Sequence, residues 1–164
     1  MKCYVDSDGV IADFDGWVRK FDPNMNTDRN DPANRRNAGK IYKLMVENYK
    51  SCFLDCGVLS DAGKFLDKLK SDPNWFVLTA VPVFKTVLGV VKNEDKANEV
   101  LDVMKENKLR FYENLGVARD KVIIVDNAQD KIMYAKGNFL YDDYAKTVSQ
   151  WIEAGGEAEL VKSS

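Results

Sequence analysis

The chain has 164 residues, 45% of them apolar, and its 24 basic and 26 acidic side chains leave a net charge of −2. This length suits one domain with a sizeable core, and the balanced charge excludes an extended basic surface for nucleic acid. No apolar run approaches the ~18 residues of a membrane helix, and no signal-like segment opens the chain. We therefore expect a cytoplasmic protein without membrane contact, as a monomer or homodimer.

The chain contains no histidine, which narrows its possible chemistry. Nucleophile systems that pair Ser or Cys with His are excluded, and so are zinc sites built on His. Cys3, Cys52 and Cys56 have no metal-finger spacing and are expected to be reduced thiols. Carboxylates, lysines and a metal ion must therefore carry any reaction.

The first predicted element is a buried strand that ends in two carboxylates. Residues 3–5 form an apolar run, Asp6 and Asp8 follow it, and Gly9 turns the chain. Two carboxylates so close repel each other unless a cation or a proton relieves them, and hard oxygen ligands suit Mg²⁺. A metal-assisted acid site is the first hypothesis, and a strand followed by a polar Asp-Gly turn is the alternative.

The region after this strand predicts a small helical cap. Residues 14–21 and 41–49 space their apolar side chains as helices do, whereas residues 22–40 are rich in Asn, Asp, Pro and Arg and predict a loop. The predicted domains are a core of residues 1–16 and 58–164 and a small helical cap of residues 17–57.

Three more apolar runs predict strands, and each run ends at a polar residue. They are residues 75–78 before Thr79, residues 122–125 before Asp126, and residues 139–141 before Asp142 and Asp143. Helical spacing recurs before, between and after these runs, over residues 60–71, 97–115 and 144–154. This alternation predicts an α/β fold with a doubly wound, mainly parallel sheet. Ligands of such sheets bind at the carboxyl ends of the strands, so the polar residues are expected to meet there.

Four segments, taken in order, carry a resemblance to a known family. They are Asp6-Ser-Asp-Gly-Val-Ile-Ala-Asp-Phe14, Leu78-Thr79-Ala80, Lys108-x-x-Phe111 leading to Leu115-Gly116, and Leu140-Tyr-Asp-Asp143 followed by Trp151 and Gly155-Gly156. This set resembles the haloacid dehalogenase-like (HAD) phosphatases, and most closely their 5′(3′)-deoxyribonucleotidase branch. The resemblance implies a Rossmann-like three-layer core with a small cap, and hydrolysis of deoxyribonucleoside or other nucleoside monophosphates.

The resemblance also implies separate tasks for the acids. Asp6 would take the phosphoryl group as an aspartyl-phosphate. Asp8 would protonate the leaving oxygen and later deprotonate the attacking water. Mg²⁺ would bind the Asp6 carboxylate, the backbone carbonyl of Asp8 and one acid of the next pair, with Asp143 preferred to Asp142.

Thr79 and Lys108 would hold the phosphoryl oxygens, and Lys108 would also offset charge beside Asp6. Ala80 stands where this branch often has a second hydroxyl, so that contact would be missing or come from a backbone N–H. The long interval after Thr79 keeps Lys85 and Lys92 as rivals of Lys108.

Lys131 resembles a lysine that some relatives aim at the substrate phosphate, and an ordinary solvated lysine is the alternative. Another open alternative is a metal site at Asp126-x-x-x-Asp130, a spacing found elsewhere in the superfamily. The candidates to close over a base or sugar are Phe14, Trp17, Tyr42 and Arg35 or Arg36, for which simple cap packing is the other interpretation.

Three competing functions remain. One is a catalytically idle member that only binds phosphate, against which the presence of both Asp6 and Asp8 argues. A phosphatase of sugar phosphates or nucleic-acid 3′ ends would use the same acids. A response-regulator receiver would instead accept a phosphoryl group at Asp55, but residues 49–52 before it are half polar and predict no strand.

Overall fold

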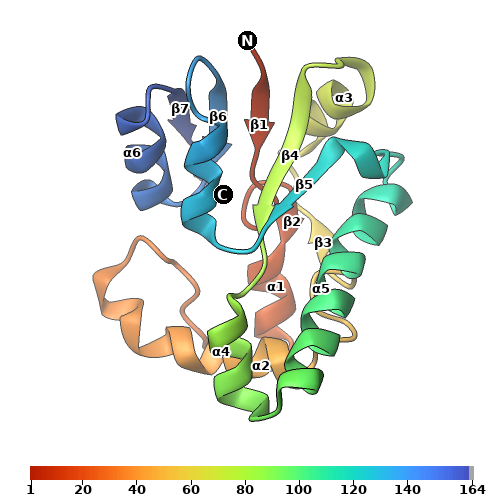
Figure 1. Ribbon diagram of the computed structural model, residues 1–164, viewed down its shortest axis with the longest axis vertical. Helices are drawn as coiled ribbons and strands as arrows, with labels where there is room; N and C mark the ends of the chain where they lie inside the picture. Colours follow the sequence, from red (N-terminus) through yellow and green to blue (C-terminus); the bar gives the residue numbers. More distant parts are fainter. Residues whose placement is uncertain (163–164) are drawn as a thin grey trace.

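The centre of the computed structural model, which describes residues 1–162, is a five-stranded parallel sheet (Figure 1). The strand order is β5-β4-β1-β6-β7, and each neighbouring pair runs parallel. The strands are β1 (Cys3–Val5), β4 (Trp75–Ala80), β5 (Val122–Val125), β6 (Phe139–Asp142) and β7 (Glu157–Leu160). The predicted α/β fold with a mainly parallel sheet is confirmed.

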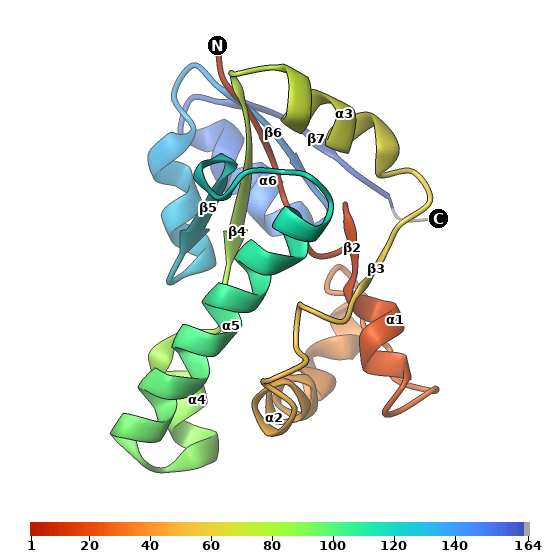
Figure 2. The same ribbon diagram turned by 90° about the vertical axis from the view of Figure 1, so that its right-hand side faces the viewer.

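Helices cover both faces of the sheet (Figure 2). One face carries α3 (Gly63–Ser71) and α5 (Glu94–Asn114), and the other carries α6 (Ala145–Glu153) and the 3-10 helix η3 (Ala128–Tyr134). Successive side chains of a strand point to opposite faces. Val5 accordingly packs in the core under α3 and α5, whereas Tyr4 packs against Trp151 of α6.

The order of the strands reverses beside β1. From β1 the chain proceeds to β4 and β5 on one side, and then crosses to β6 and β7 on the other. In parallel sheets such a reversal opens a crevice at the carboxyl ends of the two strands that flank it. Asp6 directly follows β1 and Asp142 ends β6, so both acids lie at this position.

A short antiparallel hairpin of β2 (Ala12–Asp13) and β3 (Gly57–Val58) leads into and out of the predicted cap. The elements between these strands are α1 (Phe14–Arg19), η1 (Pro32–Asn37) and α2 (Ala38–Glu47). The predicted loop over residues 22–40 therefore contains η1 and the start of α2.

An unpredicted helix, α4 (Phe84–Val91), packs against α2 and against α5 (Figure 1). Helices from two separate insertions thus face the carboxyl ends of the sheet. None of the helices in residues 1–162 combines the length and the apolar character needed to cross a membrane.

Candidate active site

The loop after β1 is a tight turn that Asp6 directly precedes and that contains Asp8. The carbonyl of Ser7 accepts hydrogen bonds from the N–H groups of residues 10–12, at 3.2, 2.9 and 3.0 Å. Gly9 has φ +83°, and the Asp143 carboxylate lies so close to its Cα that a Cβ would overlap it. Position 9 therefore needs glycine for both its backbone conformation and its space.

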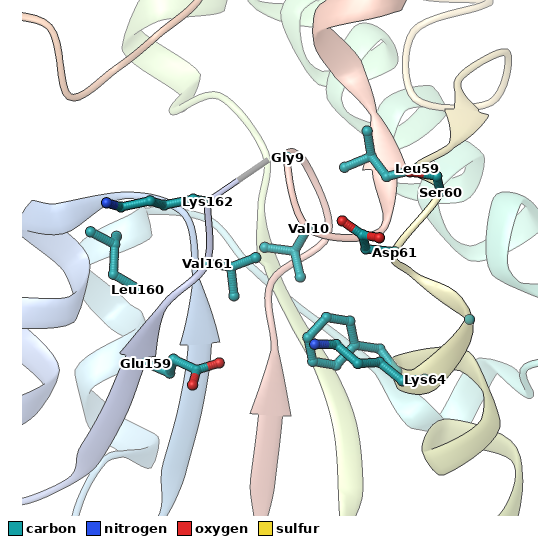
Figure 3. A pocket seen from close by; sticks show the side chains of 12 residues that line it. Gly9, Val10, Leu59, Ser60, Asp61, Lys64, Glu159, Leu160, Val161 and Lys162 are labelled. Carbon is teal, nitrogen blue, oxygen red and sulfur yellow. The ribbon is translucent and has the colours of Figure 1, made fainter. Parts of the chain in front are cut away.

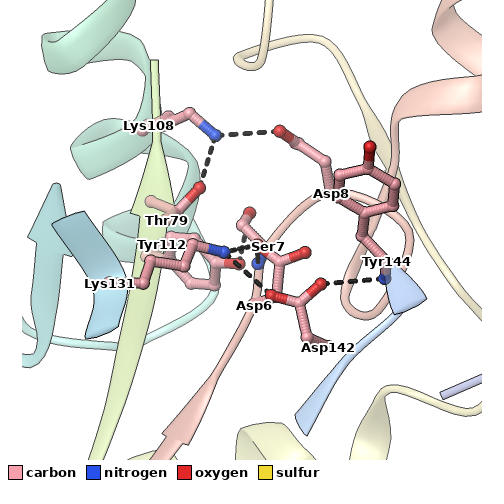
Figure 4. A network of polar contacts seen from close by, with 9 residues as sticks. All are labelled: Asp6, Ser7, Asp8, Thr79, Lys108, Tyr112, Lys131, Asp142 and Tyr144. Carbon is pink, nitrogen blue, oxygen red and sulfur yellow. Dashed lines mark hydrogen bonds and ion pairs between the residues drawn. The ribbon is translucent and has the colours of Figure 1, made fainter. Parts of the chain in front are cut away.

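Lys131 joins the acids at the ends of β1 and β6 (Figure 4). Its Nζ lies 3.0 Å from Asp6 Oδ1 and 3.0 Å from Asp142 Oδ2, and all three side chains are buried. The Ser7 N–H donates to the same Asp6 oxygen at 2.9 Å. Burial favours the neutral form of Asp6, but the charge and hydrogen bond of Lys131, a hydrogen bond with Asp143 and the charge of Lys108 together outweigh it, and the pKa of Asp6 is lowered. The alternative of a solvated Lys131 is wrong, because this side chain is buried among carboxylates.

Lys108 joins Asp8 to Thr79 at the end of β4 (Figure 4). Its Nζ lies 3.0 Å from Asp8 Oδ2 and 2.8 Å from Thr79 Oγ1, and its side chain is 1% exposed. Burial raises the pKa of Asp8, although Lys108 opposes that rise. The ion pair of Lys108 is thus with Asp8, and Lys131 is the lysine paired with Asp6.

The rival candidates lie elsewhere. Lys85 and Lys92 are exposed on and just after α4. The carboxylate of Asp126 is 80% exposed, and Asp130 is exposed as well. Asp126 therefore does not join the acids of the crevice, although it follows a strand. Asp55 is exposed in a turn, and within the described chain no strand of the main sheet leads into it.

Three carboxylates could hold a metal ion. Asp6, Asp142 and Asp143 each offer an oxygen, and these atoms lie within 4.8 Å of one another. Burial and the nearby charges raise the pKa of Asp143 to about 9 and that of Asp142 to about 6. A cation would relieve this repulsion, and a set of carboxylate oxygens fits Mg²⁺.

The hydrogen bonds favour Asp143 over Asp142 as the direct ligand. Both oxygens of Asp142 accept hydrogen bonds, Oδ2 from Lys131 and Oδ1 from the Tyr144 N–H at 2.9 Å. Oδ1 of Asp143 is buried and has no hydrogen-bond partner in residues 1–162. A buried, unpaired carboxylate oxygen is costly unless an ion satisfies it.

Tyr112 contributes a contact that sequence reasoning missed (Figure 4). Its hydroxyl donates to Ser7 Oγ at 2.6 Å and the ring is fully buried, so Tyr112 braces the turn between the two acids. Burial raises the pKa of Tyr112 well above its ordinary value. The sequence could have indicated this position, because Tyr112 follows Lys108 by one helical turn and therefore shares its face of α5.

A largely apolar pocket of about 260 Å³ opens beside Asp8 and Asp143. Its lining includes Phe14, Ile41, Tyr42, Met45, Phe53 and Ala80. Of the residues expected to close over a substrate, Phe14 and Tyr42 line this pocket. Trp17 lies behind it, buried, with its ring stacked on Phe14 at 5.8 Å between centroids.

A second pocket, of about 380 Å³, also has Gly9 in its lining (Figure 3). Besides Gly9 and Val10, it is lined by residues 59–61 and 63–65 and by residues 159–162. Its lining contains none of the predicted catalytic, phosphate-binding or metal-binding residues, so the smaller apolar pocket is the candidate substrate site.

No known family model matches this chain, and no curated protein matches it. The resemblance to the HAD phosphatases consequently stays a prediction from the motifs.

Proposed function

We propose that the protein is a Mg²⁺-dependent phosphomonoesterase that hydrolyses nucleoside monophosphates, deoxyribonucleotides first, through an aspartyl-phosphate on Asp6. The proposal places it among the HAD phosphatases, near the 5′(3′)-deoxyribonucleotidases. One observation supports it most. Burial raises the pKa of both Asp6 and Asp8, yet the net shift is downward for Asp6, which pairs with Lys131, and upward for Asp8, which pairs with Lys108. Two carboxyls whose pKa values are shifted apart are suited to separate nucleophile and acid roles.

Asp6 is the proposed nucleophile. Its Oδ1 is held by Lys131 and by the Ser7 N–H, which keep the carboxylate ionised and fix its orientation. A carboxylate oxygen attacks phosphorus, and the bond from phosphorus to the leaving oxygen breaks with its electron pair on that oxygen. The product is an acyl phosphate on Asp6 and an alcohol, which splits one difficult displacement into two easier steps.

Asp8 is the proposed acid and base. Its Oδ1 is buried without a hydrogen-bond partner in the described chain, and the residue lines the apolar pocket that the leaving group would occupy. Asp8 gives its proton to the leaving oxygen, and in the second step takes a proton from the water that attacks the acyl phosphate. Inorganic phosphate then leaves, and Asp6 is regenerated.

Lys108 and Thr79 are the proposed phosphoryl-binding groups, since both are buried and lie within 3.0 Å of each other beside Asp8. Asp6 and Asp143 are the proposed Mg²⁺ ligands, with Asp142 oriented by Lys131. When bound there, Mg²⁺ would neutralise charge on the phosphoryl oxygens.

The pocket supports a nucleoside as the leaving group. A volume of about 260 Å³ suits a small organic group, and the rings of Phe14, Tyr42 and Phe53 line it. Aromatic walls favour a flat base by stacking. The same acids would serve a sugar phosphate, so the identity of the leaving group needs a direct comparison.

Phosphate release from a substrate panel tests this function. The panel holds nucleoside 5′- and 3′-monophosphates, sugar phosphates and a 3′-phosphorylated oligonucleotide, each with Mg²⁺ or with EDTA. We expect Mg²⁺-dependent release that is fastest with deoxyribonucleotides and is abolished by Asp6→Asn. Asp126→Asn, at an exposed strand-end acid, is the matched control and should keep full activity. No release from any phosphomonoester, or an active Asp6→Asn variant, would reject the proposal.

A further inference from the structure

A basic pocket of about 350 Å³ adjoins the apolar pocket beside Asp8. The two pockets share five lining residues: Thr27, Arg29, Ala38, Ile41 and Tyr42. A ligand in the apolar pocket can therefore extend into the basic one. The catalytic acids do not line the basic pocket, which instead carries Arg29 and Arg35.

Arg29 lies against an aromatic ring in the wall of the basic pocket. Its guanidinium carbon lies 4.0 Å from the centroid of the Tyr144 ring, a cation–π contact. Within residues 1–162, neither Arg29 nor Arg35 has a carboxylate within ion-pair distance. The charge of Arg29 also acts on Asp143, where it opposes the rise in pKa.

Asp31, the acid that lines this pocket, already accepts two hydrogen bonds. Asp31 Oδ1 accepts the Ala33 N–H at 2.9 Å, as the cap of η1, and Oδ2 accepts Asn26 Nδ2 at 3.1 Å. It therefore does not pair with the arginines, and the two positive charges remain in excess of the one negative charge.

Asn30 fixes the basic pocket relative to the catalytic acids. Its Nδ2 donates to the Asp143 carbonyl at 2.8 Å, and its Oδ1 accepts the Ala145 N–H at 2.8 Å. Together with the cation–π contact of Arg29 with Tyr144, these bonds attach the cap loop to three consecutive residues of the core. The pocket is therefore held next to the predicted metal ligand Asp143.

We propose that the basic pocket is a second anion site, which binds a second phosphomonoester carried by the leaving group. The favoured substrates would then be bisphosphates, with one phosphate at Asp6 and the other at Arg29 and Arg35. This inference rests on the proposed phosphatase function. Guanidinium groups bind phosphate through paired, charge-assisted hydrogen bonds, which gives the two arginines a direct role in substrate choice.

The test compares thymidine 3′,5′-bisphosphate with thymidine 3′- and 5′-monophosphate. We expect the KM of the bisphosphate to lie about tenfold below that of either monophosphate, as one added charge-assisted contact would give. Arg35→Gln should abolish most of this tenfold difference in KM. Arg36→Gln should preserve it, because Arg36 is an exposed neighbour that lines neither pocket. Equal KM values, or a ratio that Arg35→Gln leaves intact, would overturn the inference.

A binding measurement separates this inference from the phosphatase function. Calorimetry with the Asp6→Asn variant should show that the bisphosphate binds more tightly than either monophosphate, and that adding Arg35→Gln removes the difference. If the wild type hydrolyses none of these compounds but this pattern holds, the phosphatase function fails and the anion site stands. If monophosphates are hydrolysed and the pattern is absent, the function stands and the anion site is rejected. A 5′-phosphorylated dinucleotide that shows the Arg35 effect when the bisphosphate does not would also reject it, in favour of a phosphodiester.

Discussion

Replacing Lys131 with methionine should destabilise the metal-free fold by about 3–5 kcal/mol, the usual cost of breaking a buried ion pair. The Lys131 ammonium lies 3.0 Å from Asp6 and 3.0 Å from Asp142, and their side chains are only 8% and 2% exposed. Removing it leaves two buried carboxylates without their cation. Urea unfolding in EDTA at neutral pH measures the loss. Lys105→Met is the control, since its 2.8 Å pair with Asp126 is 37% and 80% exposed and should contribute less than about 1 kcal/mol.

The loss of stability in Lys131→Met should also become smaller as the pH falls. Without Lys131, the repulsion between Asp6 and Asp142 raises their folded-state pKa values above those of the unfolded chain. A raised carboxyl pKa costs stability above that pKa, and the cost disappears as the pH falls below it. In the wild type, the lowered pKa of Asp6 contributes stability that is lost only below about pH 4, and Asp142 already has a pKa raised to about 6, which should rise further without Lys131. The difference in the free energy of unfolding between the wild type and Lys131→Met should therefore become smaller as the pH falls from about 7 to about 5. A loss below about 1 kcal/mol, or a gap that widens toward acid, would refute this account of the cluster.

Three further predictions follow from the same site. Asp143→Asn should leave the metal-free protein no less stable at pH 7, because its carboxyl has a pKa of about 9 and is costly to ionise. The same variant should lose the rise in melting temperature that Mg²⁺ gives the wild type, and a retained rise would argue against Asp143 as a ligand. Gly9→Ala should cost about 1–3 kcal/mol in chemical unfolding through strain and overlap with Asp143. Gly39→Ala, in open space at the start of α2, should be neutral or stabilising, so equal losses would contradict the geometry. Tyr112→Phe should cost about 1–2 kcal/mol in urea unfolding by leaving Ser7 Oγ without its donor, and no measurable change would show that the hydroxyl does not brace the turn.

The main strands were predictable because strands buried on both faces are continuous apolar runs. Such apolar runs occur in β1, β4, β5 and β6. The edge strand β7 was missed, since its sequence Glu-Ala-Glu-Leu is mostly exposed and lacks such a run. Helix α4 was also missed, because its sequence Phe-Lys-Thr-Val-Leu-Gly-Val-Val mixes β-branched residues with glycine and no side chain caps its N-terminus.

The acids of the site could be anticipated, and their lysine partners could not. Asp6, Asp142 and Asp143 follow strands that flank the switch in strand order, and the structure brings them together. The partner of each lysine depends on contacts across more than ten residues, which local spacing does not encode. Lys131 was predicted to face the substrate phosphate, with a solvated lysine as the alternative, and neither interpretation placed it against Asp6.

Covalent trapping at Asp6 tests the central claim most directly. The wild-type protein is incubated with thymidine 5′-monophosphate and Mg²⁺, quenched during turnover, and reduced with borohydride, which converts an acyl phosphate to an alcohol. Peptide mass spectrometry then locates the reduced residue. The proposed mechanism predicts the modification at position 6 and its absence in the Asp6→Asn variant. Phosphate release by the wild type with no modification at Asp6, or modification at Asp55 instead, would contradict it.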